Sequence, residues 1–485
     1  MKDSIVIYGP PGTGKTRKLM DLLAEQIRNG TPQNRIGLVS YTRAAAYEMA
    51  DRLNLPHGGN VATIHSYAFR LVGVLWEQVV SIRQLHEFSK IIKIPIKGGS
   101  DFTARMELGD YFLATYSYQR ATLRKDLAEV FHDRRCPGEY KLYLYFINGY
   151  EQWKKAFGLV DFEDMLELAL HADPPDLDWL FIDEAQDLSP AQWKLIKTWL
   201  PHLQGVVLAL DDDQALFEFN GANPDGGREF EQFYGSKRII LDKSWRVPSS
   251  IQELANKVIK QLPDRVDKDY RPSQMGGSIY HWTDFKWITD LSPSTSTLIL
   301  YRNHSLRRPV EEWLQIQGLP YHIMSGKAGP REDYIAKGIA VWKMIQAAYQ
   351  VFQSIKMTDY QRRALQSVLH PGLNIQVDDK HVEQIIHLRW DQVMKMPIKR
   401  SHYYQTVKRL HKDELPLTGI TLSSIHGAKG READRVVLLD GMTGNTVQAA
   451  YDNRSSEIRC MYVGLTRSRQ RLDIVTTKNP SGLIK

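Results

Sequence analysis

The sequence predicts an α/β protein with two parallel-sheet domains in tandem, each interrupted by a mainly helical insertion. Two sets of short apolar runs, separated by segments with helical spacing, predict the two sheets. The chain has 485 residues, more than one hydrophobic core usually organises. A glycine-rich loop directly after the first apolar run marks the edge at which the first sheet would bind a ligand.

The strands of the two expected sheets lie in separate parts of the chain. For the first sheet we expect strands at 4–8, 35–40, 179–182 and 205–210. For the second sheet we expect strands at 238–241, 297–301, 420–424, 435–439 and 472–476. The aromatic-rich segment 71–160 and the basic segment 331–414 have helical spacing and interrupt the two sets. The predicted first domain is therefore 1–70 with 161–240, and the predicted second domain is 241–330 with 415–485.

Residues 9–16 read GPPGTGKT and stand between an apolar run and a helical segment. In that setting, backbone N–H groups of the glycine-rich loop surround a polyphosphate, and the helix N-terminus favours its negative charge. Lys15 would reach the terminal phosphates, and the Thr16 hydroxyl would hold Mg²⁺. The predicted nucleotide-binding residues of this loop are Gly9, Pro10, Gly12, Thr13, Gly14, Lys15 and Thr16.

Acidic residues follow two other strands of the first set. Asp183 and Glu184 end the run 179–182, and the first acid suits a Mg²⁺ shell while the second suits activation of a water molecule. The segment 211–214 reads DDDQ, and three adjacent carboxylates repel one another unless a cation or hydrogen-bond donors lie near. Gln214 could connect the triphosphate to this loop. Arg246 and Arg467 are candidate arginine fingers, which stabilise charge on a transferred phosphoryl group.

The bulk composition restricts the class of protein. The net charge of +7 is compatible with an anionic partner, and the two cysteines, Cys136 and Cys460, match no metal-ligand spacing. We expect no signal peptide, no membrane span and no structural metal. Seven basic residues and the aromatics Trp390, Tyr403 and Tyr404 lie within 389–412. This segment is either a nucleic-acid surface or a solvated helix face.

Nine elements, taken in chain order, resemble the motifs of superfamily 1 DNA helicases of the UvrD/Rep type. Residues 183–187, for example, resemble the D-E-x-Q-D box, and residues 425–432 resemble the T-x-H-x-x-K-G-x-E motif. The resemblance implies two RecA-like domains with ATP and Mg²⁺ bound between them. The nine elements are 9–16, 38–49, 63–66, 161–166, 183–187, 211–222, 241–246, 425–432 and 462–468.

The resemblance also implies residue roles. Trp245 stands at the position that stacks on the adenine, and Glu432 at that of an acid near the nucleotide sugar. The ATP-handling positions implied are Lys15, Thr16, Asp183, Glu184, Gln214, Arg246 and Arg467. The nucleic-acid-contacting positions implied are Tyr41, Thr42, Arg43, His65, Ser66, Phe219 and His426. For Tyr41 and Phe219, packing in a hydrophobic core is the alternative. Asn220 stands where the family usually has an arginine.

The resemblance implies an ATP-dependent helicase that moves 3′-to-5′ on single-stranded DNA and engages single-strand/duplex junctions. Two alternatives stay open at this point. One is a single-strand translocase that unwinds little, and the other is a nucleic-acid-sensing regulatory ATPase of a larger complex. A protein loading partner is possible under each. We expect a cytoplasmic or nucleoid-associated protein of a bacterial or phage-infected cell.

Overall fold

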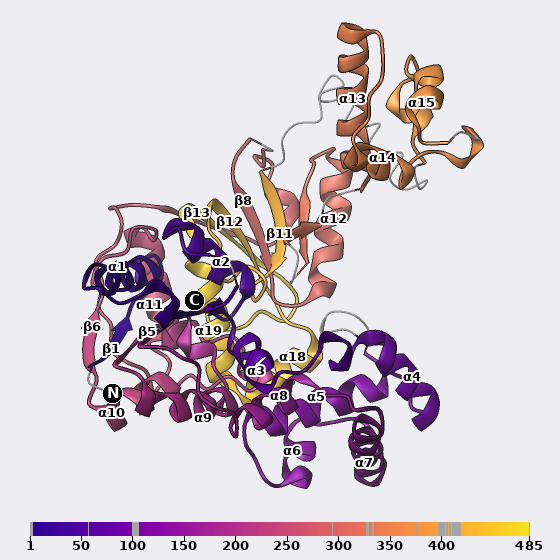
Figure 1. Ribbon diagram of the computed structural model, residues 1–485. Helices are drawn as coiled ribbons and strands as arrows, with labels where there is room; N and C mark the ends of the chain where they lie inside the picture. Colours follow the sequence, from indigo (N-terminus) through magenta and orange to yellow (C-terminus); the bar gives the residue numbers. More distant parts are fainter. Residues whose placement is uncertain are drawn as a thin grey trace. The chain divides into compact units, whose positions relative to one another are not determined.

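The computed structural model describes residues 3–56, 58–98, 106–292, 294–325, 329–331, 334–373, 376–395, 403, 406, 409 and 419–484. The chain forms two compact units. The first unit comprises Met1–Gly276 and Ala449–Thr466, and the second comprises Gly277–Gln448 and Arg467–Lys485. Figure 1 labels the helices and strands along the chain. The predicted fold class, α/β with two parallel sheets and helical insertions, is confirmed.

The first unit contains a sheet of six strands in the order β3-β2-β4-β5-β1-β6. Every strand pair in this sheet is parallel. Parallel neighbours place their carboxyl ends at one edge, so the loops that follow β1, β4 and β5 meet there. The strands are β1 (Asp3–Tyr8), β2 (Ile36–Val39), β3 (Val61–Ala62), β4 (Trp179–Ile182), β5 (Gly205–Leu210) and β6 (Lys237–Ile240).

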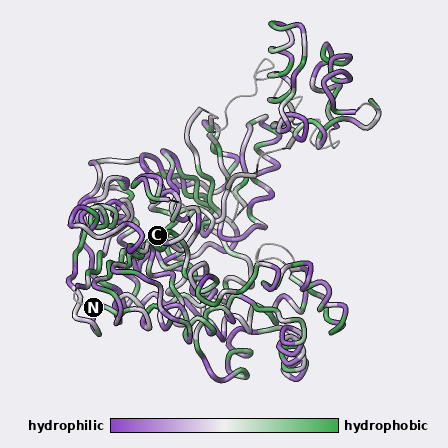
Figure 2. Tube along the Cα trace, in the orientation of Figure 1, coloured by the Kyte–Doolittle hydropathy of each residue, from purple (hydrophilic) through white to green (hydrophobic). Residues whose placement is uncertain are grey.

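Both faces of the first sheet are buried, as its apolar runs require. Along β5, Val206, Leu208 and Leu210 belong to one hydrophobic cluster, while Val207 and Ala209 belong to another. Alternate residues of a strand point to opposite faces, so the two clusters are the two faces of the sheet. The helices of the sheet's own segments are α1 (Lys15–Arg28), α2 (Arg43–Arg52), α3 (Ile64–Val72), α8 (Phe162–Ala169), α9 (Pro190–Trp199), α10 (Gly226–Tyr234) and α11 (Ser249–Ile259). In Figure 2, α1 alternates between hydrophilic and hydrophobic residues, as a helix with one buried face does.

The second unit contains a sheet of seven strands in the order β10-β9-β11-β8-β12-β13-β7. Its pairs are parallel except β10 with β9, which is antiparallel. The strands are β7 (Ser278–Trp282), β8 (Thr297–Tyr301), β9 (His322–Ser325), β10 (Gly329–Arg331), β11 (Ile420–Ser424), β12 (Ala433–Asp440) and β13 (Ser468–Thr476). The helices of its sheet segments are α12 (Arg307–Ile316) and α18 (Gly444–Asp452), and the latter runs across the boundary between the units.

One predicted strand belongs to the other sheet. The run 238–241 was expected in the second sheet, but β6 pairs with β1 in the first sheet, with Ile5 opposite Lys237. The segment that follows also differs from expectation, because residues 241–276 pack with the first unit rather than with the second. The helix α19 (Arg454–Leu465) likewise belongs to the first unit, where it contacts α11 (Figure 1). The predicted domain boundaries otherwise stay a prediction.

The first insertion has a hydrophobic core of its own. Phe88, Phe112, Tyr143, Phe146 and Trp153 are buried together there. Several of these ring pairs meet edge to face at centroid distances near 5.3 Å, as for Phe88 with Phe146 and Phe112 with Phe146. The helices of this insertion are α4 (Ile82–Ile92), α5 (Leu108–Ala121), α6 (Leu127–Asp133) and α7 (Tyr140–Phe157).

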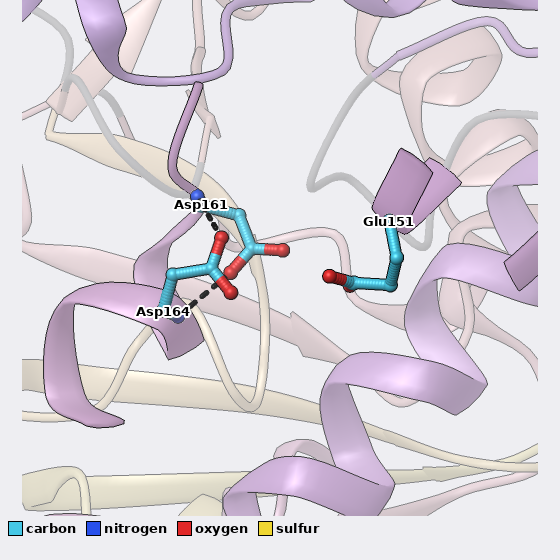
Figure 3. A group of neighbouring side chains, drawn as sticks. All are labelled: Glu151, Asp161 and Asp164. Atoms are coloured by element: carbon cyan, nitrogen blue, oxygen red, sulfur yellow. Dashed lines mark hydrogen bonds between the residues drawn. The ribbon is translucent and has the colours of Figure 1, made fainter. Parts of the chain in front are cut away.

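A buried ionic network joins this insertion to α8. Asp161 and Asp164 exchange backbone-to-carboxylate hydrogen bonds at the start of α8, and Glu151 faces them from α7 (Figure 3). The three carboxylates lie within 4.8 Å of one another, a grouping that could hold a cation. Lys154 already supplies a positive charge to these carboxylates, since its Nζ lies 2.7 Å from oxygens of both aspartates. Arg120 adds ion pairs to Asp161 and Asp164 at 3.1 and 2.6 Å. The network therefore has a structural role.

The second insertion also forms its own core. Trp390 and Tyr403 lie in it with Trp342 and Leu365. The hypothesis that these two aromatics face nucleic acid is therefore wrong, because each is only 7% exposed. Tyr404 and the basic residues Lys399, Arg400, Lys408 and Lys412 lie outside the described residues. The described helices are α13 (Tyr334–Phe352), α14 (Asp359–Gln366), α15 (Asp379–Ile385) and α16 (Trp390–Val393).

Among the described residues, no helix has both the length and the apolar content of a membrane-spanning segment.

We expect Lys154→Met to lower the free energy of unfolding by about 3–5 kcal/mol, because the change removes a buried cation and leaves half-buried carboxylates without part of their counter-charge. The Lys154 side chain is only 3% exposed. Urea denaturation of the full chain measures the effect. Arg83→Met is the matched control, since the pair of Arg83 with Glu87 is exposed and should contribute at most about 0.5 kcal/mol. Equal losses for the two variants would contradict a buried, structural network.

Candidate nucleotide and nucleic-acid sites

The loop between β1 and α1 has the backbone that a phosphate-binding loop needs. Gly12 and Gly14 have φ angles of +74° and +84°, in the left-handed region that favours glycine. The Lys15 Nζ donates to the Gly9 carbonyl oxygen at 2.7 Å, so the lysine side chain folds back over the loop. The Thr13 hydroxyl donates to the Pro10 carbonyl oxygen at 2.8 Å. The loop is thus ordered by its own side chains, with Lys15 largely buried over it.

Thr16 and Asp183 come together from α1 and the end of β4. The Thr16 hydroxyl donates to Asp183 Oδ2 at 2.8 Å. Burial raises the pKa of Asp183 to about 7, and the neighbouring Glu184 adds to the rise, while the Thr16 hydroxyl and Lys15 oppose it. A cation beside this carboxylate would favour its charged form. A hydroxyl and a carboxylate are hard oxygen donors of the kind that Mg²⁺ binds, so the residues present fit this ion.

Glu184 has an unusual backbone conformation. Its φ of +56° and ψ of +40° place a non-glycine residue in the left-handed region at the end of β4. The side-chain amide of Gln186 donates to the Glu184 carboxylate. The same Gln186 accepts from the Asp211 backbone N–H at 3.0 Å. Gln186 is fully buried and so holds Glu184 in register with the loop after β5, a role that the sequence analysis did not assign.

The three carboxylates after β5 have their counter-charge from residues that the sequence analysis missed. The Lys268 ammonium lies within ion-pair distance of Asp211, Asp212 and Asp213, at 3.3 Å from the first and 3.1 Å from the third. Burial alone would lower the pKa of Lys268, but the three carboxylates around it raise the pKa above its ordinary value. Arg265 adds a two-point contact with Asp213 at 2.9 and 2.7 Å. The pattern of three adjacent acids signalled that a cation was needed, but not which one.

Gln214 is oriented by this same cluster. Its side-chain amide donates to Asp211 Oδ2 at 2.7 Å, and its backbone N–H donates to the Asp211 carbonyl oxygen at 2.9 Å. The residue is buried. Asp211 therefore holds the amide group of Gln214 near the end of β5. Because β5 is paired with β1 in the sheet, this end lies beside the loop that follows β1.

The segment Ser244-Trp245-Arg246 docks on the phosphate loop within the first unit. The backbone N–H of Trp245 donates to the Gly12 carbonyl oxygen at 2.8 Å, and the Ser244 hydroxyl donates to the Pro11 carbonyl oxygen at 2.8 Å. A Cβ on Gly12 would lie 2.4 Å from the Arg246 Cβ. Arg246 was expected to approach from the second domain, but it lies in the same unit as the loop because this segment is hydrogen-bonded to it.

A cavity of about 280 Å³ opens beside the loop. Trp245, 71% exposed, lines it from one segment, and Arg17 and Lys18 line it from the first turn of α1. The remaining lining residues are Thr13, Gly14, Asp21 and Leu241. An aromatic ring and two cations around one hollow suit a nucleotide base and its phosphates. Arg17 was missed from the sequence, although its position directly after Thr16 was the available signal.

Arg467 and Glu432 lie in the second unit. Arg467 is 1% exposed, and its Nη1 donates to the Arg431 carbonyl oxygen at 3.4 Å. Glu432 forms an ion pair with Arg469. One residue, Thr466, separates Arg467 from the end of α19, and α19 and Thr466 belong to the first unit from Ala449 onward. The roles of both residues stay predictions.

Aromatic residues after β2 and β5 form a stacked pair. The rings of Tyr41 and Phe217 are stacked at a centroid distance of 4.6 Å, and Phe219 lies 6.1 Å from Phe217. The hydroxyl of Tyr41 bonds to the side chain of Asn220. Tyr41, Phe217 and Phe219 are all half-buried, so neither core packing nor full exposure describes them. They form a platform of rings at the carboxyl edge of the sheet.

Three other predicted nucleic-acid residues lie at helix starts. Thr42 caps α2 by accepting from the Ala45 N–H at 3.2 Å, and Arg43 is exposed beside it. Ser66 lies in the first turn of α3, where its N–H donates to the Thr63 hydroxyl at 3.2 Å. Thr42 and Ser66 therefore take part in helix starts, and the N-terminus of a helix favours the negative charge of phosphate.

His65 and His426 lie in different units and share one electrostatic property. Burial lowers the pKa of His65 to about 4. Burial lowers the pKa of His426 to about 3, with further lowering by Arg302 and Lys429. Both imidazoles are neutral at pH 7, so they would contact a nucleic acid by hydrogen bonding or ring contact rather than by charge.

Comparison with known families fits this geometry. A model of the UvrD/REP helicase N-terminal domain matches residues 1–235, and one of the UvrD-like helicase C-terminal domain matches residues 392–479. The chain belongs to the UvrD/Rep-type helicases of superfamily 1.

Individual relatives of this family are distant in sequence. The chain is 22% identical to the ATP-dependent DNA helicase UvrD2 of Mycobacterium tuberculosis over 550 aligned positions, which cover 99% of this chain and 77% of the relative. It is 25% identical to DNA helicase II of Haemophilus influenzae, with 70% of this chain and 52% of the relative covered. It is 24% identical to the ATP-dependent DNA helicase PcrA of Leuconostoc citreum, with 66% and 48% covered.

We expect Gly12→Ala to weaken nucleotide binding by more than about tenfold, because the new methyl group would clash with Arg246 and the backbone would be strained. Titration with a fluorescent ATP analogue measures the affinity. Gly30→Ala is the matched control, since Gly30 has a φ of +97° but nothing within 4 Å of an added Cβ. That control should lose about 1 kcal/mol of stability and keep its nucleotide affinity. Unchanged affinity in Gly12→Ala would contradict the close docking.

We expect Trp245→Ala to weaken binding of the same analogue about tenfold, since stacking on an aromatic side chain contributes about 1–3 kcal/mol per base. Trp76→Ala is the control, because Trp76 is similarly exposed at 64% but does not line the cavity. Equal affinities for the wild type and Trp245→Ala would exclude Trp245 as a base-stacking residue.

Proposed function

We propose that this chain is an ATP-dependent DNA helicase that uses ATP to move along single-stranded DNA and to separate duplex at a junction. One observation carries the proposal most directly. The phosphate loop, the acidic end of β4 and the Tyr41–Phe217 platform follow strands of one sheet, and neighbouring strands bring them to the same edge. The residues that would bind ATP and the rings that would bind DNA therefore follow strands of the same sheet.

Within the nucleotide site, each residue has a task that suits its contacts. Lys15 would exchange its bond to the Gly9 carbonyl oxygen for one to the terminal phosphates. Thr16 and Asp183 would hold Mg²⁺, which neutralises charge on the phosphate oxygens. Glu184, fixed by Gln186, would orient the attacking water and accept its proton. Gln214 would contact the terminal phosphate from its place on Asp211.

The two candidate arginine fingers would have different tasks, and coupling to movement would come from Arg467. Arg246 already lies with the phosphate loop, so it would contact the phosphates from within the first unit. Arg467 would reach them only when the two RecA-like domains close on ATP bound in the cleft between them. Hydrolysis would then remove the charge that holds the domains closed, and the domains would reopen.

The nucleic-acid track would use rings and helix starts rather than base-edge contacts. Tyr41, Phe219, His65 and His426 would contact bases, because stacking is indifferent to sequence and so suits a motor that must pass every base. Thr42, Arg43 and Ser66 would contact phosphates. We infer DNA as the track and 3′-to-5′ as the direction from the names and family of the relatives.

We expect Lys15→Ala to abolish ATP hydrolysis and Glu184→Gln to lower kcat by about 10²–10⁴-fold with little change in KM. Lys197→Ala is the control and should keep wild-type turnover, since Lys197 is exposed in the last turn of α9. Hydrolysis is measured without polymer and then with single-stranded DNA, duplex DNA and RNA. Unchanged turnover in Lys15→Ala would refute the ATPase assignment.

Direction and unwinding need a separate measurement. Strand displacement from duplexes with a 3′ or a 5′ single-stranded tail should proceed only from the 3′ tail. Displacement of streptavidin from a biotinylated strand without strand separation would instead identify a translocase that unwinds little.

A further inference from the structure

Two short turns follow β5, and each serves a different part of the proposed function. The first turn, Asp212–Gln214, carries the glutamine beside Asp211. The second turn, Glu218–Asn220, begins directly after Phe217, whose ring stacks on Tyr41. We call them the nucleotide turn and the aromatic turn. Only three residues, 215–217, separate them in the sequence.

One side chain from a distant part of the sequence bonds to both turns. Arg459, on α19, donates from Nε to the Asp212 carbonyl oxygen at 2.9 Å and from Nη1 to Glu218 Oε1 at 2.7 Å. The Arg459 side chain is 7% exposed and that of Glu218 is 18% exposed. Asn453, which caps α19, donates to the other carboxylate oxygen of Glu218 at 3.1 Å. All of these residues belong to the first unit.

The attachment is stiff at both ends. Lys268 and the Val266 N–H, the latter at 2.8 Å, hold the carboxylate of Asp212, and Arg459 holds its carbonyl oxygen, so Arg459 is one of the groups that place the nucleotide turn. The guanidinium group is planar, and its donors keep a fixed geometry relative to one another. A displacement of the aromatic turn must therefore break a buried charge-assisted bond, or it must move α19 and the nucleotide turn with it.

We propose that Arg459 is a positioning residue that couples occupancy of the aromatic turn by nucleic acid to the placement of Gln214 in the nucleotide site. The proposal rests on the proposed function. Base stacking near Phe217 shifts the aromatic turn, and the Arg459 contacts transmit this shift to the nucleotide turn. The chain of α19 continues directly into Thr466 and Arg467, so the same helix also leads to the second candidate arginine finger.

Glu218 is the residue through which Arg459 reaches the aromatic turn. It lies between the aromatic residues Phe217 and Phe219. A carboxylate there gives Arg459 a charged partner on the aromatic turn. The pair thus offers a change that removes the link and leaves the nucleotide and ring residues themselves in place.

The test uses Glu218→Gln, Arg459→Lys and the double variant in the full chain. For each, the ATPase rate is measured without polymer and with saturating oligo(dT), and oligo(dT) affinity is measured by fluorescence anisotropy. We expect the ratio of stimulated to basal rate to fall about tenfold in either single variant, as for the loss of one charge-assisted bond, and the double variant to fall no further. Basal rate and oligo(dT) affinity should stay within about twofold of the wild type. Asp225→Asn is the control, because its pair with Arg228 touches neither turn.

Every outcome decides the matter. A ratio that stays at the wild-type value, with or without a lower melting temperature, means that the pair only fastens α19, and it overturns the proposal. A fall in the ratio that matches a loss of oligo(dT) affinity also overturns it, since the pair would then merely shape the binding surface. Failure of the proposed function looks different: the wild type itself would show no stimulation by oligo(dT), and both proposals would fall.

Discussion

The first unit depends on the ion pairs that the buried Lys268 ammonium group forms with Asp211, Asp212 and Asp213. The ammonium group lies among three consecutive aspartates that end β5, and all four side chains are buried. Three such carboxylates could not stay charged in this position without it, since removing one partner of a buried ion pair typically costs about 3–5 kcal/mol. The contact also explains why residues 241–276 belong to the first unit. The segment that carries Trp245 and Arg246 is fastened at its far end by Lys268 and Arg265, and at its near end by hydrogen bonds to the phosphate loop.

The polar groups of the proposed nucleotide site are paired with one another. Lys15 bonds to Gly9, Thr16 to Asp183 and Gln214 to Asp211. A triphosphate entering the site would replace such bonds rather than satisfy empty donors, so each exchange yields a modest net free energy. The protein positions these side chains in advance, because their present hydrogen-bond partners hold each of them close to where a triphosphate or Mg²⁺ would bind. Glu184 is the clearest example, because its left-handed backbone costs conformational free energy and its side chain is held in place by Gln186.

Much of the fold followed from local patterns. Apolar runs after turn residues predicted most strands, because a strand buried on both faces must be apolar throughout. The strand β6 was assigned to the wrong sheet, because its sequence carries no information about which edge it joins. Trp390 and Tyr403 were expected on a surface but lie in the core of the second insertion. A segment that mixes aromatic and basic residues can bury its aromatic side chains in a core while its basic side chains face solvent. Short strands such as β3 were missed, because two residues give no periodicity.

By itself, the sequence predicted the residues of the proposed nucleotide site, namely the glycine-rich loop, Lys15, Thr16 and the acids at strand ends, because each motif is contiguous and its residue types are those that phosphate and Mg²⁺ would require. Only the tertiary structure decided which distant groups support them. The contacts of Lys268 with the aspartates, of Arg17 and Trp245 with one cavity, and of Arg459 with two turns all depend on residues brought together from separate segments. Single charged residues of this kind look like ordinary surface residues in a sequence, because burial and partners are properties of the folded chain.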